Sequence, residues 1–420
     1  MAGGDWQRDV LRELKQAGNE QQPVEPTKTV QLVRKPSGMP DVAPAAPQPA
    51  APAPVPAPGS DPRAVERTTP SPAQAPVPQP PAQVDPRTAT PVPQPRTAAR
   101  PAARPTPRDP RVPMPTPESV PTVDPRLAAA LSRPVRGDSA ARRTGRSLRQ
   151  LTASASQEVA EQTRLAREVQ QPVTTGRVIA VTSIRGGVGK TTVSALLART
   201  YNHYRHDPVL ALEADAALGT LPVRLGAETV RWSCTDLAGI LEPSMLLTDV
   251  TGYLVPVTDG GWLLPAGQGR IGPPLDVATY RTVSLALRRY FGVTVVDCES
   301  LPGDVARTAM ATAHARVVVA PVTAEGVNGT RQVLDWLARL PEPTLAHTVV
   351  ALSESSPHIR LDVKAAIGYL RETGVSVVHV PYDRHLGAGG PVINSMLSQA
   401  SRQAAAQLAA EALQFAVRTP

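Results

Sequence analysis

A glycine-rich segment near the middle of the chain carries residue types that bind phosphate groups. It reads Ile184-Arg185-Gly186-Gly187-Val188-Gly189-Lys190-Thr191-Thr192. Glycines let backbone N–H groups approach a phosphate chain closely, and the lysine can reach its outer phosphates. The first threonine hydroxyl can bind Mg²⁺, and the second can donate a hydrogen bond to the α-phosphate. The expected phosphate-binding residues are Gly186, Gly187, Val188, Gly189, Lys190, Thr191 and Thr192.

The segment departs from the strict phosphate-loop pattern G-x-x-x-x-G-K-[ST], because Ile184 stands where the first glycine belongs. A glycine-rich turn that arose by chance is the alternative interpretation. A phosphate loop must lie between a strand and a helix. The apolar run Arg177–Ser183 before the segment predicts a buried strand, and Thr191–Tyr204 after it predicts a helix. This context favours a functional loop.

Strand and helix patterns alternate through the rest of the chain. Short, continuously apolar strands separated by helices predict an α/β fold with a mostly parallel, twisted sheet and helices on both faces. Further strands are expected at Val209–Glu213, Val293–Asp297, Val317–Pro321, Thr348–Leu352 and Val375–Val380. A hairpin is expected around Asp259-Gly260-Gly261, and helices are expected over residues 275–290, 324–340, 360–371 and 394–417.

Two aspartates stand at expected strand ends, where the side chains of a parallel sheet gather around a ligand. Asp297 ends one strand, and Asp215 lies just beyond Glu213 in another. A phosphate loop needs a carboxylate on a neighbouring strand end, which favours a metal-binding role for Asp297. A cap for the following helix is the structural alternative for both aspartates. We expect Glu213 to be structural.

These motifs resemble the deviant Walker A ATPases of the ParA/MinD family, in the SIMIBI class of P-loop proteins. The family's loop reads K-G-G-x-x-K-[TS], and the resemblance covers about residues 177–415. It implies binding of ATP and Mg²⁺, with the metal at Thr191 and Asp297. It also implies that Asp215 orients the attacking water. The run Val380-Pro381-Tyr382-Asp383 resembles the family's base-contacting loop, which places Pro381 and Asp383 beside the adenine.

Arg185 is the main departure from the family pattern. The family carries a signature lysine at this position, and that lysine reaches the phosphates of the partner in a nucleotide-dependent homodimer. Arginine keeps the charge but differs in shape and hydrogen bonding. The resemblance therefore implies an ATP hydrolase in which Lys190, Asp215 and Arg185 are the catalytic residues. Weakened hydrolysis and transition-state stabilisation in trans are both compatible with Arg185. The family's base-contacting asparagine is also absent, because the corresponding region reads Leu352-Ser353-Glu354.

The N-terminal part of the chain differs in composition from the rest. Most of the 48 prolines lie between Pro23 and Pro125, among few aromatic or large aliphatic residues. Such a segment buries too little apolar surface to offset the entropy of ordering. We therefore expect a disordered Pro/Ala/Arg-rich arm over residues 19–150. The pattern within residues 1–18 predicts a short amphipathic helix with its apolar stripe on Trp6–Leu14, which is either a docking helix for a partner or a transient helix in a disordered tail. Residues 151–176 form a lead-in helix and linker, and residues 177–417 form the ATPase domain.

The charge of the chain is concentrated in the arm. The formal net charge is +8, and basic and acidic residues balance over residues 151–420. A basic arm can contact DNA or an anionic membrane surface without specificity. The two cysteines, Cys234 and Cys298, predict neither a disulfide framework nor a metal site. With no apolar run long enough to span a membrane and no signal-peptide pattern, we expect a cytoplasmic protein.

Three functions remain open at this point. One is an ATPase switch that regulates or positions a partner complex, with the partner bound through Trp6–Leu14 or the Pro-rich arm. The arm and domain together also resemble the MinD-like ATPases of actinobacterial type VII secretion loci. The second is a chromosome or plasmid partitioning ATPase that binds DNA non-specifically. The third is a nucleotide-binding scaffold that does not hydrolyse ATP.

Overall fold

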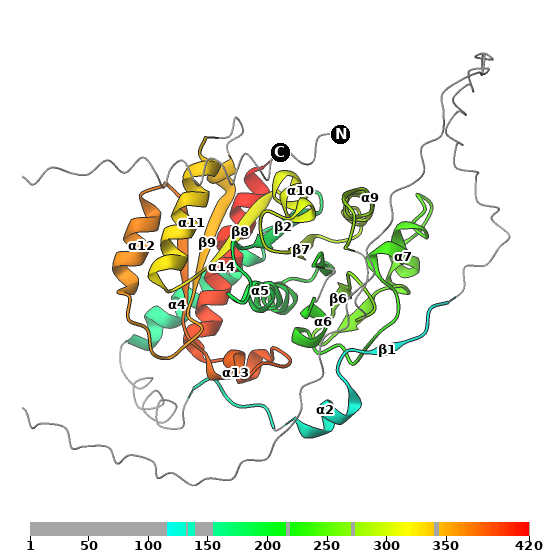
Figure 1. Ribbon diagram of the computed structural model, residues 1–420, viewed down its shortest axis with the longest axis horizontal. Coiled ribbons are helices and arrows are strands. Elements are labelled where there is room, and N and C mark those ends of the chain that lie inside the picture. Colours follow the sequence, from blue (N-terminus) through cyan, green and yellow to red (C-terminus); the bar gives the residue numbers. More distant parts are fainter. Residues whose placement is uncertain are drawn as a thin grey trace, which may run out of the picture. The chain divides into compact units, whose positions relative to one another are not determined.

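An eight-stranded sheet forms the centre of the computed structural model, which describes residues 116–131, 133–138, 154–215, 219–269, 274–339 and 344–419. The strand order is β10-β9-β8-β2-β7-β3-β6-β5 (Figure 1). Every neighbouring pair is parallel except the β5–β6 hairpin at one edge. The strands are β2 (Arg177–Thr182), β3 (Val209–Glu213), β5 (Val255–Val257), β6 (Gly261–Leu264), β7 (Val293–Asp297), β8 (Ala315–Pro321), β9 (Thr348–Ser353) and β10 (Ser376–Val380). The predicted mostly parallel sheet is confirmed.

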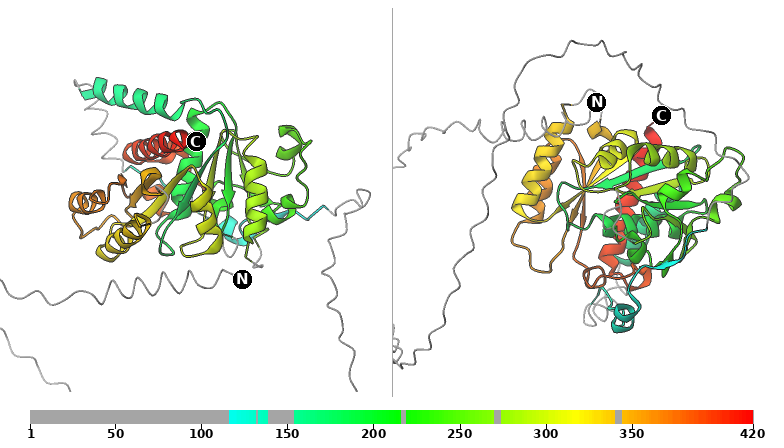
Figure 2. Two further views of the ribbon diagram at one scale, coloured as in Figure 1. Left: turned by 90° about the horizontal axis from the view of Figure 1, so that it is seen from above. Right: turned by 45° about the vertical axis from the view of Figure 1, so that its right-hand side comes forward.

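Helices cover both faces of this sheet (Figure 2). Alternate residues of one strand enter different cores: Ile179 and Val181 pack on one side, and Val178 and Ala180 pack on the other. The first side carries α4 (Ser154–Val169), α5 (Lys190–Tyr204) and α14 (Gln399–Arg418). The second side carries α7 (Cys234–Ala238), α8 (Leu247–Thr251), α9 (Val277–Leu287), α10 (Asp304–Thr312), α11 (Ala324–Leu337) and α12 (Val363–Arg371). Burial on both faces explains why the strands read as unbroken apolar runs.

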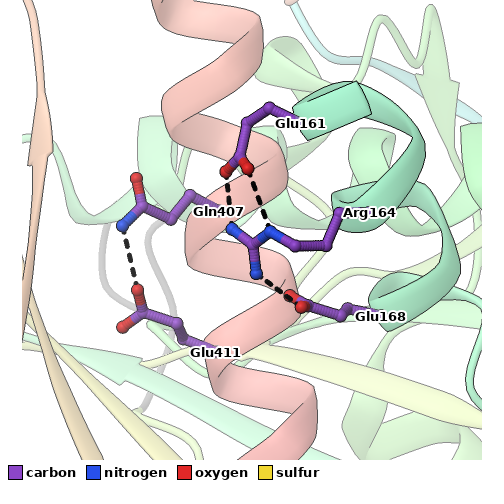
Figure 3. Close-up of polar contacts among 5 residues, drawn as sticks. All are labelled: Glu161, Arg164, Glu168, Gln407 and Glu411. Carbon is purple, nitrogen blue, oxygen red and sulfur yellow. Dashed lines mark hydrogen bonds and ion pairs between the residues drawn. The ribbon is translucent and has the colours of Figure 1, made fainter. Parts of the chain in front are cut away.

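Helix α4 is the lead-in helix that the sequence predicts, and it packs against α14 (Figure 2). Leu165 and Val169 of α4 are buried in the same core as α14. On the side of α4 that faces solvent, Arg164 lies between Glu161 and Glu168 and bonds to both (Figure 3). Exposed ion pairs of this kind stabilise a helix by only a few tenths of a kcal/mol. The apolar contacts therefore hold α4 in place.

The C-terminal helix begins later than the sequence pattern suggests. The pattern predicts one helix over residues 394–417, but the structure has a short 3₁₀ turn, η2 (Asn394–Met396), before α14. Ser398 separates the two elements, because its hydroxyl accepts a hydrogen bond from the Ser401 backbone N–H and caps α14. A capping serine at the N-terminus of a helix stabilises the start of that helix rather than its interior.

A segment of the expected linker lies on the domain. Strand β1 (Val120–Pro121) pairs with β4 (Thr229–Val230), and the Thr122 hydroxyl donates to the Ala227 carbonyl at 2.5 Å. Further along, the Gly137 N–H donates to the Met396 carbonyl at 2.8 Å. These contacts differ from the expectation of a disordered linker over residues 19–150. Their partners are remote in sequence, so composition did not indicate them. The other short elements are α2 (Pro125–Ala130), α6 (Leu221–Arg224), α13 (Arg384–Gly387) and η1 (Thr344–His347).

Other sequence predictions fall outside the described residues. The docking helix at Trp6–Leu14 and the proline-rich stretch up to residue 115 are among them. Of the helices that the structure describes, none has the length and apolarity that crossing a membrane requires.

Candidate nucleotide site

The glycine-rich loop lies between β2 and α5, at the carboxyl ends of the central strands. Gly187 and Gly189 have positive φ values of 76° and 95°, a conformation that other residues adopt only with strain. A Cβ built on Gly186 or Gly187 would meet no atom within 4 Å, so the space above the loop is open. Gly189 is the N-cap of α5 and has no side chain to cap the first-turn N–H groups. These N–H groups are available to an anion, as the sequence predicts for a phosphate loop.

Lys190, the first residue of α5, is buried with its ammonium group beside the loop after β7. Its Nζ donates to the Ser300 hydroxyl at 2.9 Å. Ser300 follows the strand that ends in Asp297, so Lys190 connects the phosphate loop to that strand end. Sequence reasoning missed Ser300, because a serine in a loop carries no motif of its own.

Asp297 is fully buried at the end of β7. Its Oδ1 accepts from the Ser194 hydroxyl of α5 at 2.9 Å, and its Oδ2 has no hydrogen-bond partner among the described residues. Burial raises the pKa of Asp297 to about 6, against the lowering effects of Thr191, Ser194 and Lys190. A buried carboxylate oxygen without a partner, next to a threonine hydroxyl, fits Mg²⁺. The described residues contain no cluster of three or more His, Cys, Asp or Glu suited to a metal.

Two more carboxylates lie beside Asp297. Glu213 is paired with Asp297 across β3 and β7, and its two oxygens accept from the backbone N–H groups of Leu221 at 3.0 Å and Ala266 at 3.1 Å. Burial raises the pKa of Glu213 to about 8, and the charges of Asp297 and Asp215 add to the effect. Asp215 also raises the pKa values of Asp297 and Glu299. The fold therefore brings Asp215 and Asp297 together, while Glu213 has a structural role.

Arg185 is exposed at the outer edge of the loop. Hydrogen bonds from the backbone N–H of Glu325 and from the Thr323 side chain lower the pKa of Glu325 at the start of α11, and the charge of Arg185 adds a smaller lowering. Within the part of the chain that the structure describes, its guanidinium donates no hydrogen bond. Its neighbour Ile184 is half-buried and lies against Gly329 of α11, where the Ile184 Cδ1 atom would be 2.8 Å from a Cβ placed on that glycine. The isoleucine at the first-glycine position thus has a packing role.

A cavity of about 230 Å³ continues from the loop toward β9 and β10. The base-contacting residues that the sequence predicts, Pro381 and Asp383, both line it. The other lining residues are Gly187, Val188, Gly189, Thr192, Val193, Leu196, Ser353, Glu354, Ser355, Val380, Tyr382, Leu386 and Gly387. The cavity therefore joins the phosphate loop to the position expected for a base.

The carboxylates that line this cavity are already bonded to the protein. Asp383 accepts from the backbone N–H groups of His385 at 2.8 Å, Leu386 at 3.3 Å and Ser398 at 2.8 Å. Glu354 accepts from the Tyr382 N–H at 3.0 Å, and its other oxygen lies 2.7 Å from the His379 Nε2. Both carboxylates shape the loop after β10. The sequence identified Asp383 by resemblance alone and gave no signal for a role of Glu354.

No family model matches the chain. It is similar to the ESX-1 secretion-associated protein EspI of Mycobacterium tuberculosis, with 28% identity over 240 residues. That match covers 55% of this chain and only 35% of EspI, so the chain spans about a third of that relative. It is also similar to an uncharacterised ATP-binding protein of Methanocaldococcus jannaschii, with 26% identity over 242 residues. This second match covers 56% of the chain and 86% of that protein.

Two solved structures are a ParA family ATPase from Chlorobium tepidum and the MinD protein of Pyrococcus horikoshii in complex with Mg-ADP. They are 17% and 21% identical, each with a TM-score of 0.44. They cover 56% of this chain, and 98% and 94% of their own chains. The chain is thus similar to an ATP-binding protein over most of that protein's length, and its glycine-rich loop lies between β2 and α5, as a phosphate loop requires.

Proposed function

We propose that this chain is an ATP-binding, Mg²⁺-dependent ATPase that acts as a switch. ATP would close a homodimer, hydrolysis would open it, and the cycle would regulate or position a partner complex. The observation that carries the proposal is the open loop at the N-terminus of α5, continuous with a cavity large enough to begin enclosing a base. Free backbone donors at a helix N-terminus favour an anion, and the cavity favours one that bears a base.

The proposed roles follow the positions of the side chains. Lys190 exchanges its bond to Ser300 for the β and γ phosphates. Thr191 and Asp297 hold Mg²⁺, and Asp215 orients the attacking water. Bound Mg²⁺ supplies neutralisation of the charge that develops on the phosphate oxygens.

Arg185 is proposed to act on the phosphates of a second copy of the chain. Its exposure and lack of hydrogen-bond partners among the described residues support this role. An arginine already bonded within its own chain would have to give up those bonds before it reached another molecule. The planar guanidinium can bind phosphate through two N–H groups at once.

The similarity to a secretion-associated protein suggests the kind of partner. We propose that the switch serves a secretion apparatus and that the N-terminal arm provides the contact. The chain shares only part of that relative's length, so the partner remains a proposal. ATP-dependent, salt-sensitive DNA binding by the full chain would instead favour the partitioning function.

The test is a comparison of the full-length chain with its Lys190→Ala variant in Mg-ATP binding and turnover. Removing a buried cation from the phosphates should weaken binding by about 100-fold or more, since hydrogen bonds to charged groups are worth roughly 1.5–3 kcal/mol each. Lys364→Ala, at an exposed lysine of α12, is the matched control and should bind like the wild type. Equal binding by the Lys190→Ala variant and the wild type would refute the assignment of the loop.

The proposed dimer switch is tested by measuring the molar mass of the full-length chain in solution with and without ATP. Asp215→Ala should trap an ATP-bound dimer, because hydrolysis is blocked while Lys190 and the loop remain intact. Arg185→Lys should keep nucleotide binding and maintain or raise turnover, since it restores the family's signature lysine. A wild-type chain and an Asp215→Ala variant that both stay monomeric with ATP bound would exclude the dimer switch but leave nucleotide binding in place.

A further inference from the structure

Arg224, the last residue of α6, connects the phosphate-loop helix to the far wall of the cavity. Its guanidinium donates to the Thr192 hydroxyl at 2.6 Å, and to the carbonyl oxygens of Leu386 at 3.1 Å and Gly390 at 3.0 Å. Thr192 and Leu386 both line the cavity. Arg224 matches no motif in the sequence, and the roles proposed above leave it unused.

The direction of the bond to Thr192 follows from the chemistry of the two groups. A guanidinium has only donors, so the threonine oxygen must accept. A hydroxyl that accepts in this way keeps its proton free to donate elsewhere. None of the hydrogen bonds within the described part of the chain is donated by the Thr192 hydroxyl. Its proton is therefore available to a ligand in the cavity, where an oxygen of a phosphate group is the matching acceptor.

The charge of Arg224 also favours an anionic ligand next to Thr192. No carboxylate among the described residues lies within ion-pair distance of its guanidinium, and all three of its acceptors are uncharged. Burial lowers the pKa of Arg224, and no neighbouring acid counters that effect. An arginine remains charged under these conditions. A partly desolvated positive charge is therefore hydrogen-bonded to the Thr192 hydroxyl. Such a charge stabilises an anion placed on the other side of that hydroxyl.

We propose that Arg224 is a positioning residue for the α-phosphate of the nucleotide, because it holds the Thr192 hydroxyl as a donor and places a positive charge behind it. This inference rests on the proposed nucleotide-binding function and adds a residue to it. The inference also gives α6, which follows shortly after Asp215, a part in nucleotide binding. The backbone of Arg224 is itself held in place, because the Val392 N–H donates to the Arg224 carbonyl at 2.8 Å.

The test measures the affinity of the full-length chain for Mg-ATP and Mg-ADP by calorimetry. We expect Arg224→Gln to weaken both by the same factor, about 10-fold, because both nucleotides contain the α-phosphate. A residue that acts on the γ-phosphate would affect ATP alone. Arg339→Gln, at an exposed arginine after α11, is the matched control and should leave both affinities unchanged.

Variants of Thr192 distinguish a positioning role of Arg224 from a purely structural one. Thr192→Val removes the hydroxyl but leaves the bonds from Arg224 to Leu386 and Gly390, and should lose affinity for ATP and ADP equally. Thr192→Ser, which restores a hydroxyl, should recover most of the affinity that Thr192→Val loses. The double variant Arg224→Gln/Thr192→Val should bind no more weakly than the weaker single variant, since the two residues act through one hydrogen bond.

Several outcomes would overturn the inference. Wild-type affinities in Thr192→Val would do so even where Arg224→Gln fails to fold. Losses that multiply in the double variant, or that affect ATP alone, would do so as well. A wild-type chain that binds neither ATP nor ADP would instead refute the proposed function, and the two failures are therefore distinguishable.

Discussion

The nucleotide cavity has two halves that differ in how their polar groups are bonded. The phosphate half comprises the loop Gly186–Thr192 together with Asp297 beside it, and within the described residues its first-turn N–H groups and one carboxylate oxygen have no partners. The base half comprises Ser353–Ser355 and Pro381–Gly387, and its two carboxylates are bonded to backbone N–H groups. Unpartnered buried polar groups are costly, and they persist where a ligand completes them. We therefore expect the phosphate half to supply most of the binding energy for a nucleotide.

Asp297 provides the strongest test of that assignment. Asp297→Asn keeps the bond to Ser194 but removes the charge that would hold Mg²⁺, and we expect turnover to fall by about 100-fold, since a metal contributes several kcal/mol to phosphoryl transfer. Binding of Mg²⁺-tripolyphosphate, which has no base, should weaken as well. Asp335→Asn on the surface of α11 is the matched control.

The same variant should not be less stable than the wild type. Burial raises the pKa of Asp297 to about 6, which means that the ionised carboxylate is disfavoured in the folded state. A neutral amide removes that cost. Thermal melting of both proteins at pH 7 provides the measurement, and a large loss of stability in the variant would indicate a structural role instead.

Glu213 sharpens the comparison, because it is a bonded carboxylate next to the phosphate half, paired with Asp297 across β3 and β7. Its pKa is raised from 4.5 to about 8 in the folded state, so the folded protein binds more protons than the unfolded chain between these values. Stability should be greatest below about pH 4.5 and should be lost as the pH rises to about 8, by up to roughly 1.4 kcal/mol per pH unit.

Urea unfolding of the wild type and of Glu213→Gln at pH 6.5, 7.5 and 9 would test this effect, since the other titrating groups are common to both proteins. The wild type should lose stability from each pH to the next, with a larger loss per pH unit between the first two values. Glu213→Gln should cost stability at every pH, because its amide places a donor against a backbone N–H, but its unfolding should show a flatter dependence on pH. A wild type with constant stability from pH 6.5 to 9 would show that Glu213 stays ionised.

The two halves also differ in how far the sequence predicted them. The phosphate half is local: nine consecutive residues lie between a strand and a helix, so the sequence alone predicts phosphate- and metal-binding roles for Lys190 and Thr191. The base half is assembled from residues far apart in the sequence. Glu354 bonds to Tyr382 across 28 positions, and Arg224 bonds to Leu386 across 162. Such contacts depend on the order of the strands in the sheet. A single sequence does not specify which distant residues this order brings together.

The contrast between local and long-range patterns also separates the elements of the fold that the sequence predicted from those that it did not. Buried parallel strands were predicted because burial on both faces leaves an unbroken apolar pattern. Strand β1 was not, because two residues in a proline-rich stretch carry no periodicity, and its partner β4 lies more than a hundred positions away. The start of α14 was missed because Ser398 reads as an ordinary polar residue until its capping bond is seen.

Glu354 should give the smallest effect and the clearest separation of the two halves. Glu354→Gln retains one acceptor for the Tyr382 N–H but loses the charge beside His379, so the loop that carries Pro381 should loosen rather than unfold. We expect ATP affinity to fall by only about three-fold, or roughly 0.7 kcal/mol. Tripolyphosphate affinity should not change, because that ligand has no base to contact the loop. Calorimetry with both ligands provides the measurement, and Glu372→Gln on the surface after α12 is the matched control. Equal losses for the two ligands would mean that Glu354 acts on the phosphate half, and the division of the cavity would then be wrong.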